Sequence, residues 1–180
     1  RAGWLFVLAV CGVAVWGLCV SAAAGGPSLR LEFGLGDGEA SRLTWMVQAG
    51  FVAGTLLSAV LGLADRLDPR RFFMAAALVA SAANALLLLF PPDAPAVLVL
   101  RFITGACRAG VYPVGMKMAT TWARGDMGLL IGTLVGALTL GSAAPHLFNA
   151  FGGTDWRFTI GTASLVALIA AVLVNFVGLG

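Results

Sequence analysis

Residues 101–122 read RFITGACRAGVYPVGMKMATTW, a long apolar stretch that contains basic residues. On a helix, Arg101, Arg108 and Tyr112 share one face, because they are seven and four residues apart. A basic side chain at membrane depth costs roughly 2.5–3.5 kcal/mol on insertion scales, and it usually faces a cavity or a partner. The stretch therefore predicts a membrane-spanning helix that carries a functional site.

The composition of the whole chain indicates an integral membrane protein. Of its 180 residues, 60% are hydrophobic and 11% are charged, whereas a soluble domain carries roughly a quarter charged residues. The net charge of +3 is small and scattered along the chain. We therefore expect membrane lipid, and no nucleic acid, among its partners.

Apolar windows predict an all-α fold, a polytopic membrane protein with six transmembrane helices. Each window is close to the 20 or so residues that a helix needs to cross the hydrocarbon. The helices are expected to form one bundle and one domain over residues 1–180. Their approximate bounds are residues 4–24, 43–63, 72–90, 96–122, 128–150 and 158–178.

The distribution of Lys and Arg predicts the orientation of the bundle. Cytoplasmic loops carry an excess of these residues, and a cytoplasmic N-terminus is therefore expected, in a bacterial inner (plasma) membrane. Because the chain does not begin with Met, we expect it to be part of a longer protein. The counted residues are Arg1, Arg66, Arg70, Arg71 and Arg124 on one side and Arg30, Arg42 and Arg157 on the other.

Two predicted helices carry small residues at every fourth position. Such ridges let helix backbones approach closely in lipid. They predict close packing, either inside this bundle or against a partner. The ridges consist of Gly50, Gly54, Ser58 and Gly62 in the second helix and Gly128, Gly132 and Gly136 in the fifth.

Four local patterns, taken in their order along the chain, resemble the N-terminal six-helix half of a major facilitator superfamily transporter. They are the charged turn of residues 62–71 after the second helix, Arg101-x-x-x-Gly105 in the fourth, the Gly-rich fifth helix with its Gly141-Ser-Ala-Ala-Pro145 sequence, and Asp155-Trp156-Arg157 at the start of the sixth. Together they cover nearly the whole chain.

The resemblance implies a twelve-helix transporter, in which a second six-helix half comes from the same chain or from a second copy. It also implies that the charged turn is a gating loop, formed here by Asp65, Arg66, Arg70 and Arg71. The turn departs from the family pattern at two places, because Leu61 and Asp68 stand where the family has glycine.

Arg108 is the leading candidate for substrate binding. It lies near the middle of the fourth helix, where transporters of this family that move anions often have an acidic residue. Its guanidinium stays charged and offers a planar fork to oxyanions. Tyr112, Arg101 and Gln48 are the other candidates, because Tyr112 and Arg101 share the face of Arg108 and the resemblance places the second helix beside the cavity. Arg101 has an alternative, structural interpretation in which it binds backbone carbonyls.

No nucleophile triad, phosphate-binding loop or metal-ligand spacing occurs in the sequence, so no catalysis, cofactor or metal is expected. The predicted function is a secondary active transporter that moves a small anionic solute by alternating access. The alternative is a non-transporting six-helix subunit that serves as a docking or assembly component of a larger membrane complex. The ridges of small residues would then be its partner interfaces.

Overall fold

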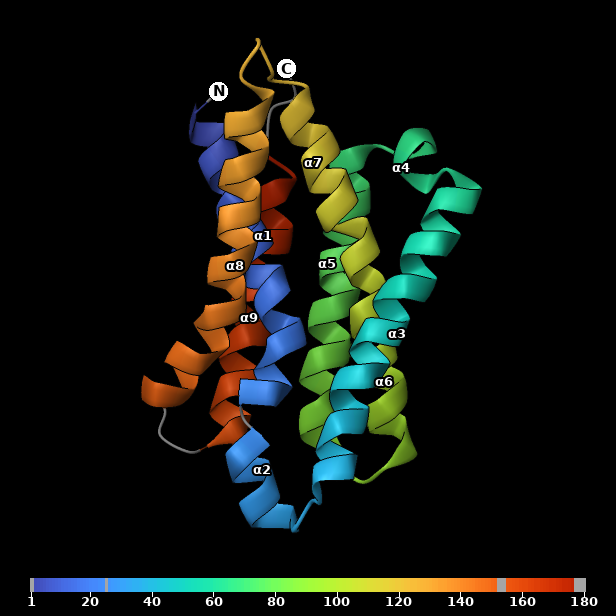
Figure 1. Ribbon diagram of the computed structural model, residues 1–180, viewed down its shortest axis with the longest axis vertical. Helices are drawn as coiled ribbons and strands as arrows, with labels where there is room; N and C mark the ends of the chain where they lie inside the picture. Colours follow the sequence, from blue (N-terminus) through green and yellow to red (C-terminus); the bar gives the residue numbers. More distant parts are fainter. Residues whose placement is uncertain (1, 25, 152–154, 177–180) are drawn as a thin grey trace.

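The computed structural model describes residues 2–24, 26–151 and 155–176, and throughout these ranges its regular elements are helices (Figure 1). Six helical spans are long and apolar enough to cross a membrane, which confirms the predicted all-α, polytopic fold. The spans are α1 Ala2–Ala24, α3 Asp37–Leu61, α5 Pro69–Leu86 with the 3₁₀ turn η1 Leu87–Leu89, α6 Pro95–Cys107 with η2 Arg108–Gly110 and α7 Tyr112–Thr120, α8 Met127–Phe151, and α9 Trp156–Val174.

The second span starts six residues earlier than predicted. Helix α3 begins at Asp37, and the Glu39 carboxylate accepts a hydrogen bond from the Gly36 amide at 3.3 Å. We expected charged residues to mark a loop here, but acidic groups in a first turn stabilise a helix N-terminus. The preceding segment, also expected to be loop, contains the short helix α2 Gly26–Phe33.

Helix α2 is tied to the start of the last span. Glu32 accepts a hydrogen bond from Trp156 Nε1 at 2.6 Å and pairs with Arg157 at 2.9 Å. The ring of Phe33 stands edge-on to Trp156, with 6.1 Å between their centroids. The Asp155-Trp156-Arg157 sequence therefore joins two segments that are more than 120 residues apart.

The fourth span is interrupted in its middle. Helix α6 ends at Cys107, residues Arg108–Gly110 form a 3₁₀ turn, and α7 starts at Tyr112. Pro113 has no amide hydrogen, and its ring crowds the carbonyl four residues earlier, which is a common cause of a helix break. The predicted helix over 96–122 is therefore two helices that meet at Arg108.

The spans form two groups that pack against each other. Figure 1 shows α1, α8 and α9 in one group and α3, α5 and the α6–α7 span in the other. The closest packing joins α3 to α6 and α1 to α8 and α9, while α5 packs on α9 and connects the groups. Phe73, Leu18 and Met118 are among the fully buried core residues.

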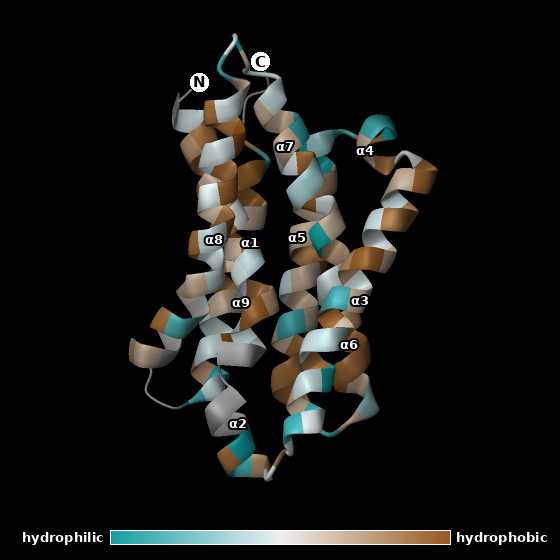
Figure 2. Ribbon diagram, in the orientation of Figure 1, coloured by the Kyte–Doolittle hydropathy of each residue, from teal (hydrophilic) through white to brown (hydrophobic). Residues whose placement is uncertain are grey.

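The outer surface of the helices is apolar. Phe6, Leu56 and Leu129 are 62–69% exposed on three different spans. Figure 2 shows hydrophobic residues along the helices and hydrophilic ones gathered mainly at the two ends of the bundle. Exposed apolar surface on this scale fits contact with lipid rather than water.

The α3–α6 contact depends on glycine. A Cβ atom on Gly50 would overlap the carbonyl of Phe102, and one on Gly105 would overlap the carbonyl of Val47. A Cβ atom on Gly54 would lie 2.5 Å from the carbonyl oxygen of Ala106. These glycines let two backbones touch, as small residues do where lipid surrounds the helices.

The other glycines of the two ridges lie elsewhere. Gly62 has a φ of 60° and ends α3 in a left-handed cap, so we reassign it from helix packing to helix termination. No heavy atom lies within 4 Å of a Cβ placed on Gly128, Gly132 or Gly136. Of the two interpretations offered for the fifth helix, packing inside this bundle does not apply to these three positions.

Gly50→Ala and Gly132→Ala add the same methyl group in two different surroundings. We expect Gly50→Ala to lower the free energy of unfolding by about 1–3 kcal/mol, because α3 and α6 must separate to admit it. Gly132→Ala should leave stability unchanged or raise it, because the new methyl meets open space and alanine favours helix. Thermal unfolding of both variants in detergent checks this, and equal melting temperatures would contradict it.

Candidate functional site

Arg108 is a buried cation near the midpoint of the 26-residue span Pro95–Thr120. Its exposed fraction is 7%, and its Nε has no hydrogen-bond partner within the described part of the chain. No ion pair joins it to an acidic side chain among the described residues either. A buried charge is normally paired, so this guanidinium has an unfilled binding capacity.

Aromatic rings from two other spans surround the guanidinium. Its Cζ lies 3.6 Å from the ring centre of Trp16 in α1 and 4.7 Å from that of Phe51 in α3. Both distances are within the range of cation–π attraction. Tyr112 packs edge-on against Trp16, with 6.1 Å between ring centroids. We call Arg108, Trp16, Phe51 and Tyr112 the Arg108 site.

Trp16 is itself held in place. Its indole nitrogen donates a hydrogen bond to the Ser142 hydroxyl of α8 at 2.9 Å, and Gly141 of α8 lies against the backbone of Val13 and the Cβ of Trp16. The Arg108 site is therefore built from α1, α3 and the broken fourth span, with α8 supporting it from behind.

Arg101 has a different environment. It is 1% exposed and donates hydrogen bonds to the carbonyls of Leu18 at 3.4 Å and Cys19 at 2.5 Å. It also donates to Asn84 Oδ1 at 3.2 Å. Its terminal nitrogens are therefore engaged within the protein, whereas its Nε, like that of Arg108, has no partner among the described residues. These bonds favour the structural interpretation of Arg101 that the sequence left open.

Asn84 is the centre of the polar network that contains Arg101. Its side chain accepts a hydrogen bond from the Ser21 hydroxyl at 3.2 Å and donates to Ser164 Oγ at 3.0 Å. The Ser81 hydroxyl donates to the carbonyl of Ser164 at 2.7 Å. Four spans, α1, α5, α6 and α9, are joined by this network in the bundle interior.

Both arginines reach the same turn of α1. Arg101 binds the carbonyls of residues 18 and 19, while Arg108 lies over the ring of Trp16, with Cys19 beside it. Two positive charges thus lie close to one helical turn, and no acidic side chain among the described residues pairs with either of them. The local field attracts anions.

The remaining substrate-binding candidates lie at different distances from Arg108. Tyr112 belongs to the site through Trp16, and it also lines a cavity of about 20 Å³ with Gly12. Arg101 lines a separate cavity of similar size beside Trp156. Gln48 is exposed on α3, one helical turn before Phe51. The structure thus brings Tyr112 to Arg108, leaves Gln48 near the edge and directs Arg101 elsewhere.

The predicted gating loop contains a defined ion pair. Asp65, in the short helix α4 Leu63–Arg66, pairs with Lys117 Nζ of α7 at 2.7 Å. The same ammonium group donates to the carbonyl of Ala64 at 2.6 Å. The hydrogen bond from Lys117 lowers the pKa of Asp65 below its ordinary value of 3.8. Lys117 therefore ties the turn of residues 62–71 to α7.

Asp68 has a local task in the same turn. Its carboxylate accepts hydrogen bonds from the amides of Arg70 at 2.9 Å and Arg71 at 3.4 Å, and thus caps the N-terminus of α5. Pro69 follows at the first helical position, where a proline is well tolerated. The residue that replaces the glycine of the family pattern is thus a helix cap.

Sequence reasoning missed Trp16, Phe51 and the hub role of Asn84. A tryptophan in the interior of a span is a usable signal, since this residue prefers the membrane interfaces. Phe51 looks like any apolar residue of α3, and Asn84 is a single amide in an apolar run. Across the described residues, no group of three His, Cys, Asp or Glu side chains is placed to hold a metal ion.

The apolar six-span bundle with a buried, unpaired cation at mid-depth has the character of a membrane transport protein. The family model described as Major Facilitator Superfamily matches residues 4–178, and the chain belongs to this superfamily of membrane transporters. No curated protein matches the chain. The family resemblance that the sequence motifs indicated is confirmed.

Asn84→Leu tests the buried network with little change in volume. We expect it to destabilise the protein by about 1–3 kcal/mol in total, because Arg101, Ser21 and Ser164 each lose one hydrogen-bond partner and keep their bonds to backbone carbonyls. Thr133→Val is the control, because this exposed hydroxyl bonds only to a carbonyl of its own helix. Thermal unfolding in detergent gives the comparison; a loss no larger than that of the control would contradict the network.

The Asp65–Lys117 pair should respond to acid. Because the folded pKa of Asp65 is lowered below 3.8, its contribution is present at neutral pH and is lost as the pH falls below 3.8 through the folded pKa. Hydrogen exchange of the amides of residues 62–71, corrected for intrinsic rates, should therefore speed up in that window. Asp65→Asn should show the faster exchange already at pH 7, and Asp93→Asn should not.

Proposed function

We propose that this chain forms the substrate-binding half of a secondary active transporter that moves a small anionic solute by alternating access. The observation that carries the proposal is the guanidinium of Arg108, which is buried at mid-span with an unpartnered Nε. The transported anion would be the partner of the Arg108 guanidinium, because the described residues supply no acidic side chain to it.

The surroundings of Arg108 suit a reversible anion contact. Arginine remains charged when buried and presents a planar fork to carboxylate-like groups. The rings of Trp16 and Phe51 stabilise the cation without neutralising it. Arg101 of α6 adds a second positive charge beside the same turn of α1, and its hydrogen bonds to α1 keep its side chain in place. Binding and release therefore need no rearrangement of a competing ion pair.

A second six-helix half, from the same chain or from a second copy, would complete the cavity. Only 17% of the α3 span and 22% of the α8 span are buried, against 44–50% of the others. Gly128, Gly132 and Gly136 of α8 leave a smooth face without neighbours among the described residues. These two surfaces support docking of a second bundle, with the substrate held between the halves.

The Lys and Arg distribution supports a cytoplasmic position for the turn of residues 62–71 and for the start of α1. Figure 1 places the start of α1, the end of α9 and α4 at the same end of the bundle. The proposed location is a bacterial inner membrane.

The same exposed faces of α3 and α8 also favour the second candidate, a subunit that docks into a larger membrane complex without a transport cycle. The two functions differ at Arg108. A docking subunit needs its outer faces, whereas a transporter needs the buried cation.

Uptake of radiolabelled carboxylate, nitrate and phosphate into proteoliposomes tests the proposal. We expect Arg108→Ala to lower uptake at low substrate concentration by at least about 30-fold, because losing one partner of a buried charged contact costs about 2 kcal/mol or more. Arg108→Lys keeps the charge but not the fork and should fall in between.

Arg42→Ala is the control, since Arg42 is exposed at the far end of α3. Undiminished uptake of the transported anion by Arg108→Ala, with an unchanged size-exclusion profile, would overturn the role of Arg108. Wild-type protein that moves none of the three anions but co-purifies in a stable membrane complex would favour the docking subunit.

A further inference from the structure

A lateral groove of about 350 Å³ lies between α3, α5 and the α6–η2 part of the fourth span. Its volume falls within the roughly 300–1,000 Å³ that is usual for small-molecule sites. Small residues leave the space open, and the surface that lines it is almost entirely apolar. The larger side chains along it include Leu57, Leu63, Phe72, Val79, Phe102 and Ile103.

The groove runs along α5 from the end that carries the charged turn. Phe72 and Val79, both in its lining, are seven residues apart, or about 10 Å along a helix. That length corresponds to about two-thirds of one leaflet of a hydrocarbon core about 30 Å thick. Val79 lies at the middle of the span Pro69–Leu89. The groove therefore begins near one membrane interface and reaches about the middle of the membrane.

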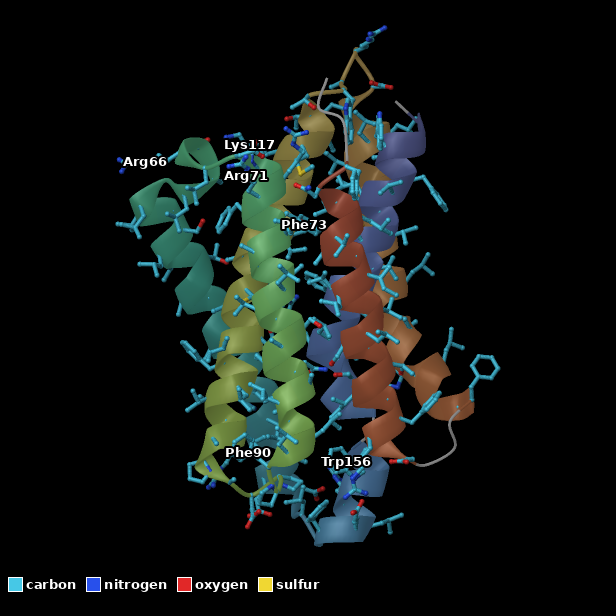
Figure 3. All side chains as sticks on the ribbon, turned by 180° about the vertical axis from the view of Figure 1, so that it is seen from behind. Arg66, Arg71, Phe73, Phe90, Lys117 and Trp156 are labelled. Atoms are coloured by element: carbon cyan, nitrogen blue, oxygen red, sulfur yellow. The ribbon has the colours of Figure 1, made fainter. Side chains whose placement is uncertain are left out.

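Two arginines lie on the elements that form the interfacial end of the groove. Leu63 lines it on α4 and Phe72 on α5. Arg71 precedes Phe72 and stands one helical turn before Ala75, another lining residue. Arg66 folds back so that its Nε lies 3.8 Å from a Cβ position on Gly62, next to Leu63. Figure 3 shows Arg66, Arg71 and Lys117 at this same end of the bundle.

Two of these charges have no acidic partner within the described ranges. Asp65 is paired with Lys117, and Asp68 with the N-terminus of α5 and with Arg70 at 3.7 Å. No ion pair of Arg66 or Arg71 is present among the described residues. The end of the groove is therefore positively charged, while its interior is apolar.

We propose that this groove is a binding site for an anionic phospholipid. One acyl chain lies in the groove against Phe72 and Phe102, and the phosphate contacts Arg66 and Arg71. The long side chains of these arginines extend from the end of the span into the headgroup region. The Lys and Arg count predicts that this end is cytoplasmic, and the cytoplasmic leaflet is the one that carries anionic lipid.

The proposal does not depend on the transported solute. It concerns the outer side of the α3–α5 contact, whereas Arg108 lies among α1, α3 and the fourth span. The lipid chain would fill the space that the α3–α6 crossing leaves between α3 and α5 and so brace these two helices. A failure of the anion proposal would leave the lipid site intact, and the reverse also holds.

Cys107 provides a native reporter, because it lines the groove and is half-buried, while Cys11 and Cys19 are buried in the core. The purified protein in detergent is titrated with phosphatidylglycerol or phosphatidylcholine. The rate of N-ethylmaleimide modification of Cys107 is followed by peptide mass spectrometry, with Cys107→Ala as the blank. We expect phosphatidylglycerol to slow modification at concentrations where phosphatidylcholine does not.

Arg66→Gln/Arg71→Gln should raise the half-protecting concentration of phosphatidylglycerol by about 25-fold, or about fivefold for each arginine. Arg124→Gln removes one exposed charge from the turn after α7, at the same end of the bundle, and should change nothing. Ala75→Trp fills the groove and should abolish retention of phosphatidylglycerol in native mass spectrometry while both arginines remain.

Equal protection by the two lipids would overturn the proposed headgroup contact. Unchanged protection in the double variant would overturn it as well. If neither lipid protects Cys107, while the double variant or Ala75→Trp changes the oligomeric state, a second copy of the chain covers the groove and the lipid proposal is wrong.

Discussion

The bundle depends on how one buried cation is satisfied where water is absent. Arg101 donates hydrogen bonds to two carbonyls of α1 and to the side-chain oxygen of Asn84. Asn84 in turn donates a hydrogen bond to Ser164 of α9. Apolar helices in lipid have little reason to choose one partner over another, because the hydrophobic effect does not distinguish between them. A network of directed hydrogen bonds that can form in only one arrangement supplies that choice. The register of α1 against the fourth and sixth spans follows from it.

The two arginines of the fourth span show that the same side chain can have two roles two helical turns apart. Arg101 contacts hydrogen-bond acceptors and is a fixed part of the interior. Arg108 contacts ring faces, which attract the cation without occupying its donors. A buried guanidinium whose donors are not all used is suited to a ligand that binds and dissociates. We therefore assign a structural role to Arg101 and a candidate binding role to Arg108.

Most of the fold could be predicted from the sequence, because the length and charge content of each apolar window decide whether a helix crosses the membrane. The site was only partly predictable. Arg108 could be found because a charge inside an apolar run is conspicuous. Trp16 and Phe51 reach it from distant spans, and Phe51 carries no local signal. Gly50 and Gly62 belong to the same four-residue repeat of small residues, but Gly50 packs against α6 and Gly62 caps α3. The sequence cannot separate these roles, because only tertiary contacts and the backbone φ distinguish them.

The break in the fourth span also has a mechanical meaning. Its first half, α6, is fixed against α3 by the glycine crossing and against α1 by Arg101. Its second half, α7, is joined to the turn of residues 62–71 by Lys117. Arg108 stands where these two rigid segments meet, so a change in the angle between them would act first on this residue. The 3₁₀ turn thus places Arg108 at a hinge. Movement of residues 62–71 and binding of a ligand at the Arg108 site would both change the backbone torsions of Arg108–Gly110.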